Sequence, residues 1–327
     1  MEQLLFATEV LLNGLMTGVM YALVALGFVL IYKASGVFNY AQGVLALFAA
    51  LTLVGIQQGQ IPFSHLINAA FGTNLHGFGW TIPSILAILL TAGVMVVLAI
   101  AIEKLVLRHL VGQEPIILFM ATIGLAYFLE GLGDVMWGAD VKMLDVGLPQ
   151  GMSETIDQVT FNWFGYGFFI DRLDIWATLI AALLVASLVA FSQYTKQGRA
   201  MRAVADDHQA ALSVGINLQF IWVMVWSIAG FVALVAGIMW GTKSGVQFSL
   251  SLIALKALPV LMLGGFTSIP GAIVGGLIIG VGEKLFEFFV GPMIGGATEN
   301  WFAYVLALLF LVFRPQGLFG EKIIERV

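Results

Sequence analysis

The stretch LLFATEVLLNGLMTGVMYALVALGFVLI occupies residues Leu4–Ile31, and Glu9 is its only charged residue. As an α-helix it would be about 40 Å long, which exceeds the ~30 Å hydrocarbon layer of a bilayer. A water-soluble core has no need of such a segment, and further apolar stretches follow it along the chain. We expect a first membrane helix that is retained, because a signal peptide would have a basic leader and a shorter apolar run.

The composition also indicates a membrane protein. Of the 327 residues, 60% are hydrophobic and only 10% are charged, against the ~25% that is usual in soluble domains. Glycine is abundant, and the spacings Gly14-x3-Gly18 and Gly271-x3-Gly275 suit close helix packing. Cysteine is absent, which excludes disulfides and thiolate metal sites. The four histidines are scattered and the net charge is −5, so we expect neither a bound metal nor a nucleic-acid partner.

Apolar regions divide the chain into predicted membrane passes. The region 252–290 is long enough for two passes, and Gly264-Gly265 and Ser268-Ile269-Pro270-Gly271 interrupt it. Such a break predicts a helix–turn–helix, or a pair of short or re-entrant helices. We therefore expect an all-α polytopic fold over residues 1–327 with about nine helices, eight and ten being the alternatives. The regions are Leu4–Ile31, Gly36–Ile56, Trp80–Ile102, Pro115–Trp137, Ile175–Ser192, Leu218–Gly241, 252–290 and Trp301–Phe313.

The distribution of basic residues predicts the orientation, because cytoplasmic loops carry an excess of Lys and Arg. Under the nine-pass arrangement most basic residues fall on one side, so the N-terminus is expected outside and the C-terminus inside. The predicted inner group is Lys33, Lys104, Arg108, Lys196, Arg199, Arg202, Arg314, Lys322 and Arg326. The predicted outer group is Lys142, Arg172 and Lys243.

Two of the predicted outer loops are long and differ in charge. Residues 57–79 contain no Lys or Arg, whereas residues 138–174 carry six acidic side chains against two basic ones. A solvated loop and a landing surface for an extracytoplasmic partner both fit the loop 138–174.

Residues 195–217 form a polar stretch rich in alanine on the predicted cytoplasmic side. Met201, Val204, Ala205 and Leu212 can share an apolar stripe, which predicts a short amphipathic helix along the membrane surface. Gly215 suits the end of that helix. A plain linker, a catalytic site at Asp206-Asp207-His208 and a docking helix are three alternatives. Successive helical residues diverge by ~100°, so the docking helix fits best.

Five segments spread over nearly the whole chain carry a family resemblance. They are Asn13-Gly14 with Tyr21-Ala22-Leu23 and Ala25-Leu26-Gly27; Gly36-Val37-Phe38-Asn39-Tyr40-Ala41-Gln42-Gly43; Gly198-Arg199 through Gly215-Ile216; Leu255-Lys256-Ala257 with Gly264-Gly265-Phe266-Thr267-Ser268-Ile269-Pro270-Gly271-Ala272; and Arg314-Pro315-Gln316-Gly317-Leu318-Phe319-Gly320. In this order they resemble the LivH/LivM-type permeases of branched-chain amino acid ABC importers.

The resemblance implies a transport subunit rather than an enzyme. No Walker A motif occurs, so ATP and Mg²⁺ would bind two separate cytoplasmic ATPase subunits, and this chain would bind no cofactor. The other implied partners are a second, related permease, giving a heterodimer, and a periplasmic binding protein. The location would be the bacterial inner membrane. The residues implied in coupling to the ATPase are Gly198, Arg199, Arg202, Ala203, Asp206, Asp207, Ala210 and Gly215.

Polar residues inside the apolar regions are candidates for the transport path or a gate, because burying them in lipid is costly. Lys256 either pairs with Glu283, snorkels to the interface or lines the path. Glu283 and Glu287 share a helix face, where we expect a structural ion pair or an interface position. Asn39 either caps a helix or lies beside the gate. The full set of path or gate candidates is Asn39, Gln42, Lys256, Gly264, Gly265, Pro270 and Gly271.

The expected function is therefore alternating-access import of branched-chain or other hydrophobic amino acids, driven by partner ATPases. The same machine carrying urea, short amides or small carboxylates is one alternative. An autonomous channel or ion-coupled carrier is another, and it would conduct without ATP. An intramembrane enzyme is a third, for which the sequence offers no convergent acid–base or metal ligands.

Overall fold

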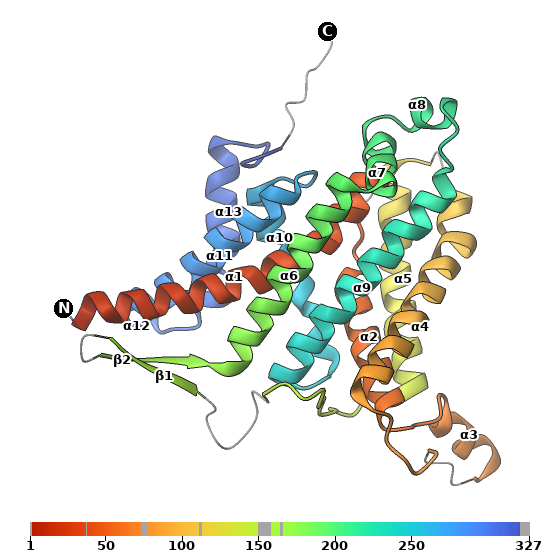
Figure 1. Ribbon diagram of the computed structural model, residues 1–327, viewed down its shortest axis with the longest axis horizontal. Helices are drawn as coiled ribbons and strands as arrows, with labels where there is room; N and C mark the ends of the chain where they lie inside the picture. Colours follow the sequence, from red (N-terminus) through yellow and green to blue (C-terminus); the bar gives the residue numbers. More distant parts are fainter. Residues whose placement is uncertain are drawn as a thin grey trace. The chain divides into compact units, whose positions relative to one another are not determined.

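The computed structural model of the chain describes residues 2–36, 38–73, 77–110, 113–149, 158–163 and 166–320. These residues are predominantly helical (Figure 1). The α-helices are α1 (Glu2–Ser35), α2 (Gln42–Gln57), α3 (Ser64–Phe71), α4 (Ser84–Leu105), α5 (Pro115–Trp137), α6 (Arg172–Tyr194), α7 (Lys196–Asp206), α8 (His208–Ser213), α9 (Leu218–Ser244), α10 (Ile253–Gly264), α11 (Ile269–Phe289), α12 (Gly291–Ile294) and α13 (Phe302–Phe313). Three short 3₁₀ helices are η1 (Leu107–Leu110), η2 (Phe248–Leu252) and η3 (Thr298–Asn300), and strands β1 (Gln158–Trp163) and β2 (Tyr166–Asp171) form an antiparallel hairpin.

Six of the described helices are long and apolar enough to cross a bilayer, namely α1, α4, α5, α6, α9 and α11. Three shorter apolar stretches accompany them: α2, the continuous run of η2 and α10, and α13. This agrees with an all-α polytopic fold. The region 252–290 is a helix–turn–helix, in which Gly265 (φ +100°) turns the chain and the Ser268 hydroxyl accepts a 3.0 Å hydrogen bond from Gly271 N–H.

The structure differs from the sequence prediction in two loops and in one helix. The predicted loop 57–79 contains helix α3, and the predicted loop 138–174 contains the β1–β2 hairpin. The predicted single amphipathic helix at 198–213 is two helices, α7 and α8. The chain breaks between them because Asp207 is extended (φ −156°, ψ 113°) and its carboxylate caps α8.

The chain folds as two compact units. Unit 1 comprises Met1–Leu30, Ser153–Val189 and Ala254–Val327. Within it, α1 and α11 approach closely through glycines, since a Cβ on Gly18 would lie 2.6 Å from the carbonyl oxygen of Gly276. A Cβ on Gly14 would likewise lie 2.8 Å from the Cα of Val281. The predicted packing role of the Gly14-x3-Gly18 spacing is therefore confirmed.

The second glycine spacing also serves packing within unit 1. A Cβ on Gly275 would lie 2.6 Å from the carbonyl oxygen of Val260, and Gly271 faces the backbone of Gly264 across the hairpin. Helices α10 and α11 can therefore pack with almost no side chain between them.

Unit 2 comprises Ile31–Met152 and Ala190–Ile253. Its centre is α2, which is buried from Gln42 to Gly55 and packs against α4, α5, α9 and η2. Helix α4 packs along α9, where Met95 lies against Gly230. Helices α7 and α8 lie at one end of this bundle and α3 lies at the other (Figure 1).

Candidate functional site

Helices α7 and α8 lie between the candidate spans α6 and α9, and side-chain caps define their ends. The Thr195 hydroxyl accepts a 2.9 Å hydrogen bond from Gly198 N–H at the start of α7. The Asp207 carboxylate accepts hydrogen bonds from Gln209 N–H (2.8 Å) and Ala210 N–H (3.0 Å) at the start of α8. Such caps satisfy amides that a helix leaves unpaired. Side-chain caps therefore fix where α7 and α8 begin within the polar stretch.

The predicted end of the polar helix is confirmed at Gly215. This residue has φ +83°, and Ile216 N–H donates back to Ala211 C=O over 3.0 Å. A glycine in the left-handed region after a helix, with that back-donation, is a Schellman-type ending.

The predicted apolar stripe is only partly correct. Met201 and Val204 are buried and Ala205 is half-buried, but Leu212 is 53% exposed. The kink at Asp207 turns α8 away from the direction of α7, so the 3.6-residue period does not continue across it. Val214 is 75% exposed as well, which places two uncovered aliphatic side chains beside the charged ones.

The predicted coupling residues divide by exposure. Gly198 is buried where α7 meets the end of α6, and a Cβ there would collide with the backbone of Phe191 and Ser192. Arg202 and Ala203 are half-buried. The exposed members are Arg199, Asp206, Asp207, Ala210 and Gly215.

Asn39 and Gln42 lie buried in the core of unit 2. Asn39 Oδ1 accepts from Ala41 N–H over 3.1 Å, and Gln42 Nε2 donates to Ala229 C=O over 3.2 Å. Asn39 therefore stabilises the turn before α2, whereas the N-cap position is Ala41, which has no side-chain hydrogen bond. The two side chains connect the start of α2 to the middle of α9, and neither is exposed.

Lys256 is the centre of a charged network in unit 1. Its Nζ lies 2.8 Å from Glu283 Oε1 and donates over 2.5 Å to the carbonyl oxygen of Glu299. Tyr21 Oη donates to the same Glu283 oxygen over 3.2 Å. The Glu283 side chain is fully buried while that of Lys256 is 24% exposed. Of the three alternatives for Lys256, pairing with Glu283 is confirmed.

The network extends along the same face of α11. The Glu287 carboxylate accepts from the backbone N–H groups of Ala297, Thr298 and Glu299 and from the Thr298 hydroxyl. Lys284 pairs with Glu299 over 2.7 Å. The predicted structural role of Glu283 and Glu287 is thus confirmed: Glu283 pairs with Lys256, and Glu287 together with Lys284 fixes η3 to α11.

The turn between α10 and α11 contains four more path or gate candidates. Pro270 lies in the first turn of α11, where the missing N–H costs nothing. The segment 314–320 closes this turn, because Leu318 N–H donates to Leu263 C=O over 2.8 Å and Phe319 N–H donates to Gly264 C=O over 3.1 Å. Gly265 leaves room for this segment, since its Cβ would lie 2.9 Å from Gly320 N.

Sequence reasoning missed a second lysine with a defined role. Lys142 Nζ donates to Gln60 Oε1 over 2.8 Å and to Trp137 C=O over 2.5 Å, and its backbone pairs with Val246. Burial lowers the pKa of Lys142, and the nearby Asp140 carboxylate opposes that shift. Its position after an apolar helix could have suggested a tie between loops, but the partners come from distant segments that no local pattern connects.

The comparisons with known proteins agree with this architecture. A model of the family described as branched-chain amino acid transport system / permease component matches residues 10–314. The chain is 28% identical to the high-affinity branched-chain amino acid transport system permease protein LivH of Escherichia coli, with 100% of this chain and 99% of that protein covered. It is also 28% identical to BraD of Pseudomonas aeruginosa, with 100% of both chains covered.

A more distant relative is the probable branched-chain amino acid transport permease protein LivH of Methanocaldococcus jannaschii. It is 25% identical over 91% of this chain and 88% of its own length. The family match spans most of the chain and includes both the α7–α8 region and the α10–α11 turn. The chain therefore belongs to the family of branched-chain amino acid transport system permease components.

Proposed function

We propose that this chain is the transmembrane permease subunit of an ATP-driven, binding-protein-dependent importer for branched-chain or other hydrophobic amino acids. The observation that carries the proposal is the family match over residues 10–314, in a chain whose described part contains six helices long and apolar enough to cross a membrane. The protein is a transport component, and ATP hydrolysis belongs to two separate cytoplasmic subunits. A second, related permease and a periplasmic binding protein complete the proposed assembly.

The proposed topology has nine crossings in the inner membrane of a bacterium, six by the long helices and three by the shorter apolar stretches. The N-terminus would lie outside and the α7–α8 end of unit 2 in the cytoplasm. The clustering of Lys196, Arg199 and Arg202 at that end supports this orientation, because cytoplasmic segments are enriched in basic residues.

The proposed coupling surface consists of the exposed residues Arg199, Asp206, Asp207, Ala210, Leu212 and Val214. A cytoplasmic ATPase subunit would cover its two aliphatic side chains and pair with its charges. Helix α7 packs against α9 and is joined to α6 through the Thr195 cap. A force on the coupling surface would therefore reach α9 and the end of α6.

We place the gate of the proposed alternating-access cycle at the Lys256–Glu283 pair and the turn between α10 and α11. The Lys256–Glu283 pair would act as a latch on α10 and α11, and the hairpin residues Gly264, Gly265, Pro270 and Gly271 would act as its hinge. Glu283 Oε2 is buried and has no hydrogen-bond partner within the described part of the chain. A buried oxygen of this kind can gain a hydrogen bond when its surroundings rearrange. Asn39 and Gln42 would hold α2 on α9 during the movement.

The coupling role is tested by charge reversal in the complete reconstituted transporter. Asp206→Arg should weaken association of the ATPase subunit by about tenfold, because it reverses an exposed charge that the ATPase subunit would pair with on the coupling surface. ATP-driven amino acid uptake should fall with it. Asp145→Arg is the matched control for association of the ATPase subunit, since Asp145 is an exposed aspartate at the opposite end of unit 2. Unchanged association and uptake in Asp206→Arg would remove the coupling role.

The transport class and the cargo need separate measurements. The purified chain alone in liposomes should show no sustained amino acid flux, and robust flux without ATP would instead indicate a channel or carrier. The ligand bound by the cognate binding protein identifies the cargo. A branched-chain amino acid is the expected ligand, and a urea, amide or small carboxylate ligand would replace it.

A further inference from the structure

Helix α3 and the segment that follows it expose an unusual amount of apolar surface. Leu66 is 58% exposed, Phe71 79%, Phe78 67% and Trp80 62%. No Asp, Glu, Lys or Arg occurs between residues 57 and 83. A water-exposed loop of this length normally carries charge, and contiguous exposed apolar side chains indicate an interaction surface.

The two faces of α3 are arranged in the reverse of what water favours. Ser64 is buried and Asn68 is half-buried, so the polar side chains face the protein. The opposite face presents Leu66 and Ala70 to the surroundings, and Phe71, the last residue of the helix, is 79% exposed. A helix on the surface of a soluble domain turns its apolar face inward, so the medium around α3 is apolar on at least one side.

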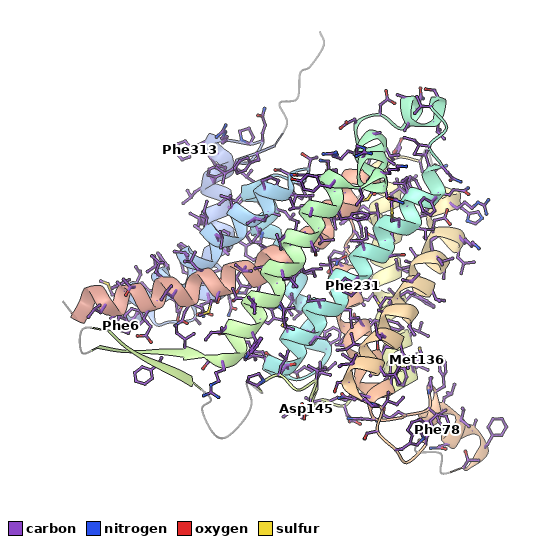
Figure 2. The ribbon with its side chains drawn as sticks, in the orientation of Figure 1. Phe6, Phe78, Met136, Asp145, Phe231 and Phe313 are labelled. Atoms are coloured by element: carbon purple, nitrogen blue, oxygen red, sulfur yellow. The ribbon has the colours of Figure 1, made fainter. Side chains whose placement is uncertain are left out.

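This surface is held in place by backbone hydrogen bonds at both ends. Phe63 N–H donates to Met136 C=O at the end of α5 over 3.0 Å. After α3, Phe78 N–H donates to Gly59 C=O over 3.0 Å, and Ile82 N–H donates to Gln57 C=O over 2.9 Å. Figure 2 labels Phe78 and Met136 at this end of unit 2. The apolar side chains are therefore presented by an ordered structure.

The exposed surface continues directly into the side of α4. Ile85 is 77% exposed and Leu89 is 64% exposed on this candidate span. Helix α4 has the highest hydropathy of the six candidate spans, so lipid is the medium that its exposed side chains suit. Trp80 lies just before α4, at the level where tryptophan is enriched in membrane proteins.

We propose that the α3 surface, defined as Leu66, Ala70, Phe71, Phe78 and Trp80, lies in the bilayer interface and binds lipid at the boundary between headgroups and acyl chains. The uncharged sequence favours lipid over a soluble protein partner, since protein interfaces carry a polar rim. The α3 segment would then anchor the end of unit 2 in the membrane plane, as interfacial amphipathic helices do. The proposal rests on the chain being a membrane permease, but on neither its cargo nor its coupling.

The chain has no cysteine, so single-cysteine variants carry a label at one position only. We would label Leu66→Cys with an environment-sensitive fluorophore in the full transporter, in phosphatidylcholine nanodiscs with or without a lipid bearing a nitroxide near its headgroup. Val141→Cys is the matched control, because Val141 is also 58% exposed but lies between Asp140 and Lys142 in the other loop.

We expect the nitroxide lipid to quench the label at residue 66 about twofold or more above the label at residue 141. Equal quenching at the two positions would overturn the proposal. A shielded but unquenched label at residue 66 in the assembled transporter would assign the surface to the partner permease. A change in the fluorescence of this label only when the binding protein is added would assign the α3 surface to that protein. Either of these two results would also overturn the proposal. The assay uses neither cargo nor ATP, so it can fail while the proposed transport function holds.

Discussion

Lys256 in unit 1 and Lys142 in unit 2 use different means to hold a half-buried ammonium group. Each donates to a backbone carbonyl over 2.5 Å, Lys256 to Glu299 and Lys142 to Trp137. Lys256 adds an ion pair with the carboxylate of Glu283, whereas Lys142 adds the neutral amide oxygen of Gln60 and has the Asp140 carboxylate as a nearby charge. Lys256 belongs to an apolar helix and Lys142 to a loop. Lys256 is thus held by direct contact with a counter-charge among membrane helices, whereas the hydrogen bonds of Lys142 go to neutral acceptors in a loop.

The comparison predicts its largest effect at Lys256. The variant Lys256→Met leaves the fully buried Glu283 carboxylate without its counter-charge, and we expect a loss of about 3–5 kcal/mol in the free energy of unfolding. Thermal unfolding of the purified chain in detergent measures it. The double variant Lys256→Met/Glu283→Leu should recover most of the loss, because no uncompensated charge remains. A double variant as unstable as the single one would show that the packing of Lys256, and not its charge, matters.

The corresponding substitution in unit 2 should lower the free energy of unfolding by a smaller amount. Lys142→Met removes two hydrogen bonds, but Gln60 and the Trp137 carbonyl can bind water instead, so we expect about 1–2 kcal/mol. The same unfolding measurement applies, and Gln60→Leu should account for part of the effect. A loss as large as that of Lys256→Met would end the distinction between the two lysines.

A third lysine tests whether the exposure of an ion pair determines how much it contributes to the free energy of unfolding. Lys284 pairs with Glu299, and the two side chains are 32% and 37% exposed. Since exposed ion pairs contribute little, Lys284→Met should change the free energy of unfolding by less than about 1 kcal/mol. It is also the control for Lys256→Met, because both residues contact Glu299.

The smallest expected effect is a pH dependence at Lys142. Burial lowers the pKa of Lys142 in the folded chain, so the folded state releases this proton before the unfolded state does. Stability should therefore rise as the pH increases from the lowered pKa towards the ordinary lysine value of about 10.4. Unfolding temperatures measured across this alkaline range should show a shallower rise in Lys142→Met. An equal rise in both proteins would assign the dependence to other groups.

The sequence predicted the features that depend on local periodicity. The apolar regions coincide with α1, α2, α4, α5, α6, α9 and α13, and the glycine break at 264–271 with the turn between α10 and α11. These follow from helix length and from the conformational freedom of glycine. Pairing of Lys256 with Glu283 was one of three alternatives, since spacing alone does not bring residues of two helices together.

Two kinds of feature could not be predicted from the sequence. In one, either of two adjacent residues could have the role, and in the other, the contact joins segments far apart in the chain. Asp206 and Asp207 are alike in sequence, and only the structure shows that Asp207 caps α8 and breaks the stripe before Leu212. The hydrogen bonds of Lys142 and of segment 314–320 join residues far apart in the chain. The inverted faces of α3 become apparent only when the side that packs on α5 is known.

Closure of α10 by Leu318 and Phe319 bears on the order in which the protein is assembled. Both donors leave the ribosome only after α10, α11 and α13 have been synthesised, so the carbonyls of Leu263 and Gly264 stay without these donors until then. A nascent chain halted before Leu318 would present an open helix end to the cell's quality-control proteases. The hydrogen bonds that close the turn between α10 and α11 can therefore form only after α13, the last apolar helix described, has been synthesised.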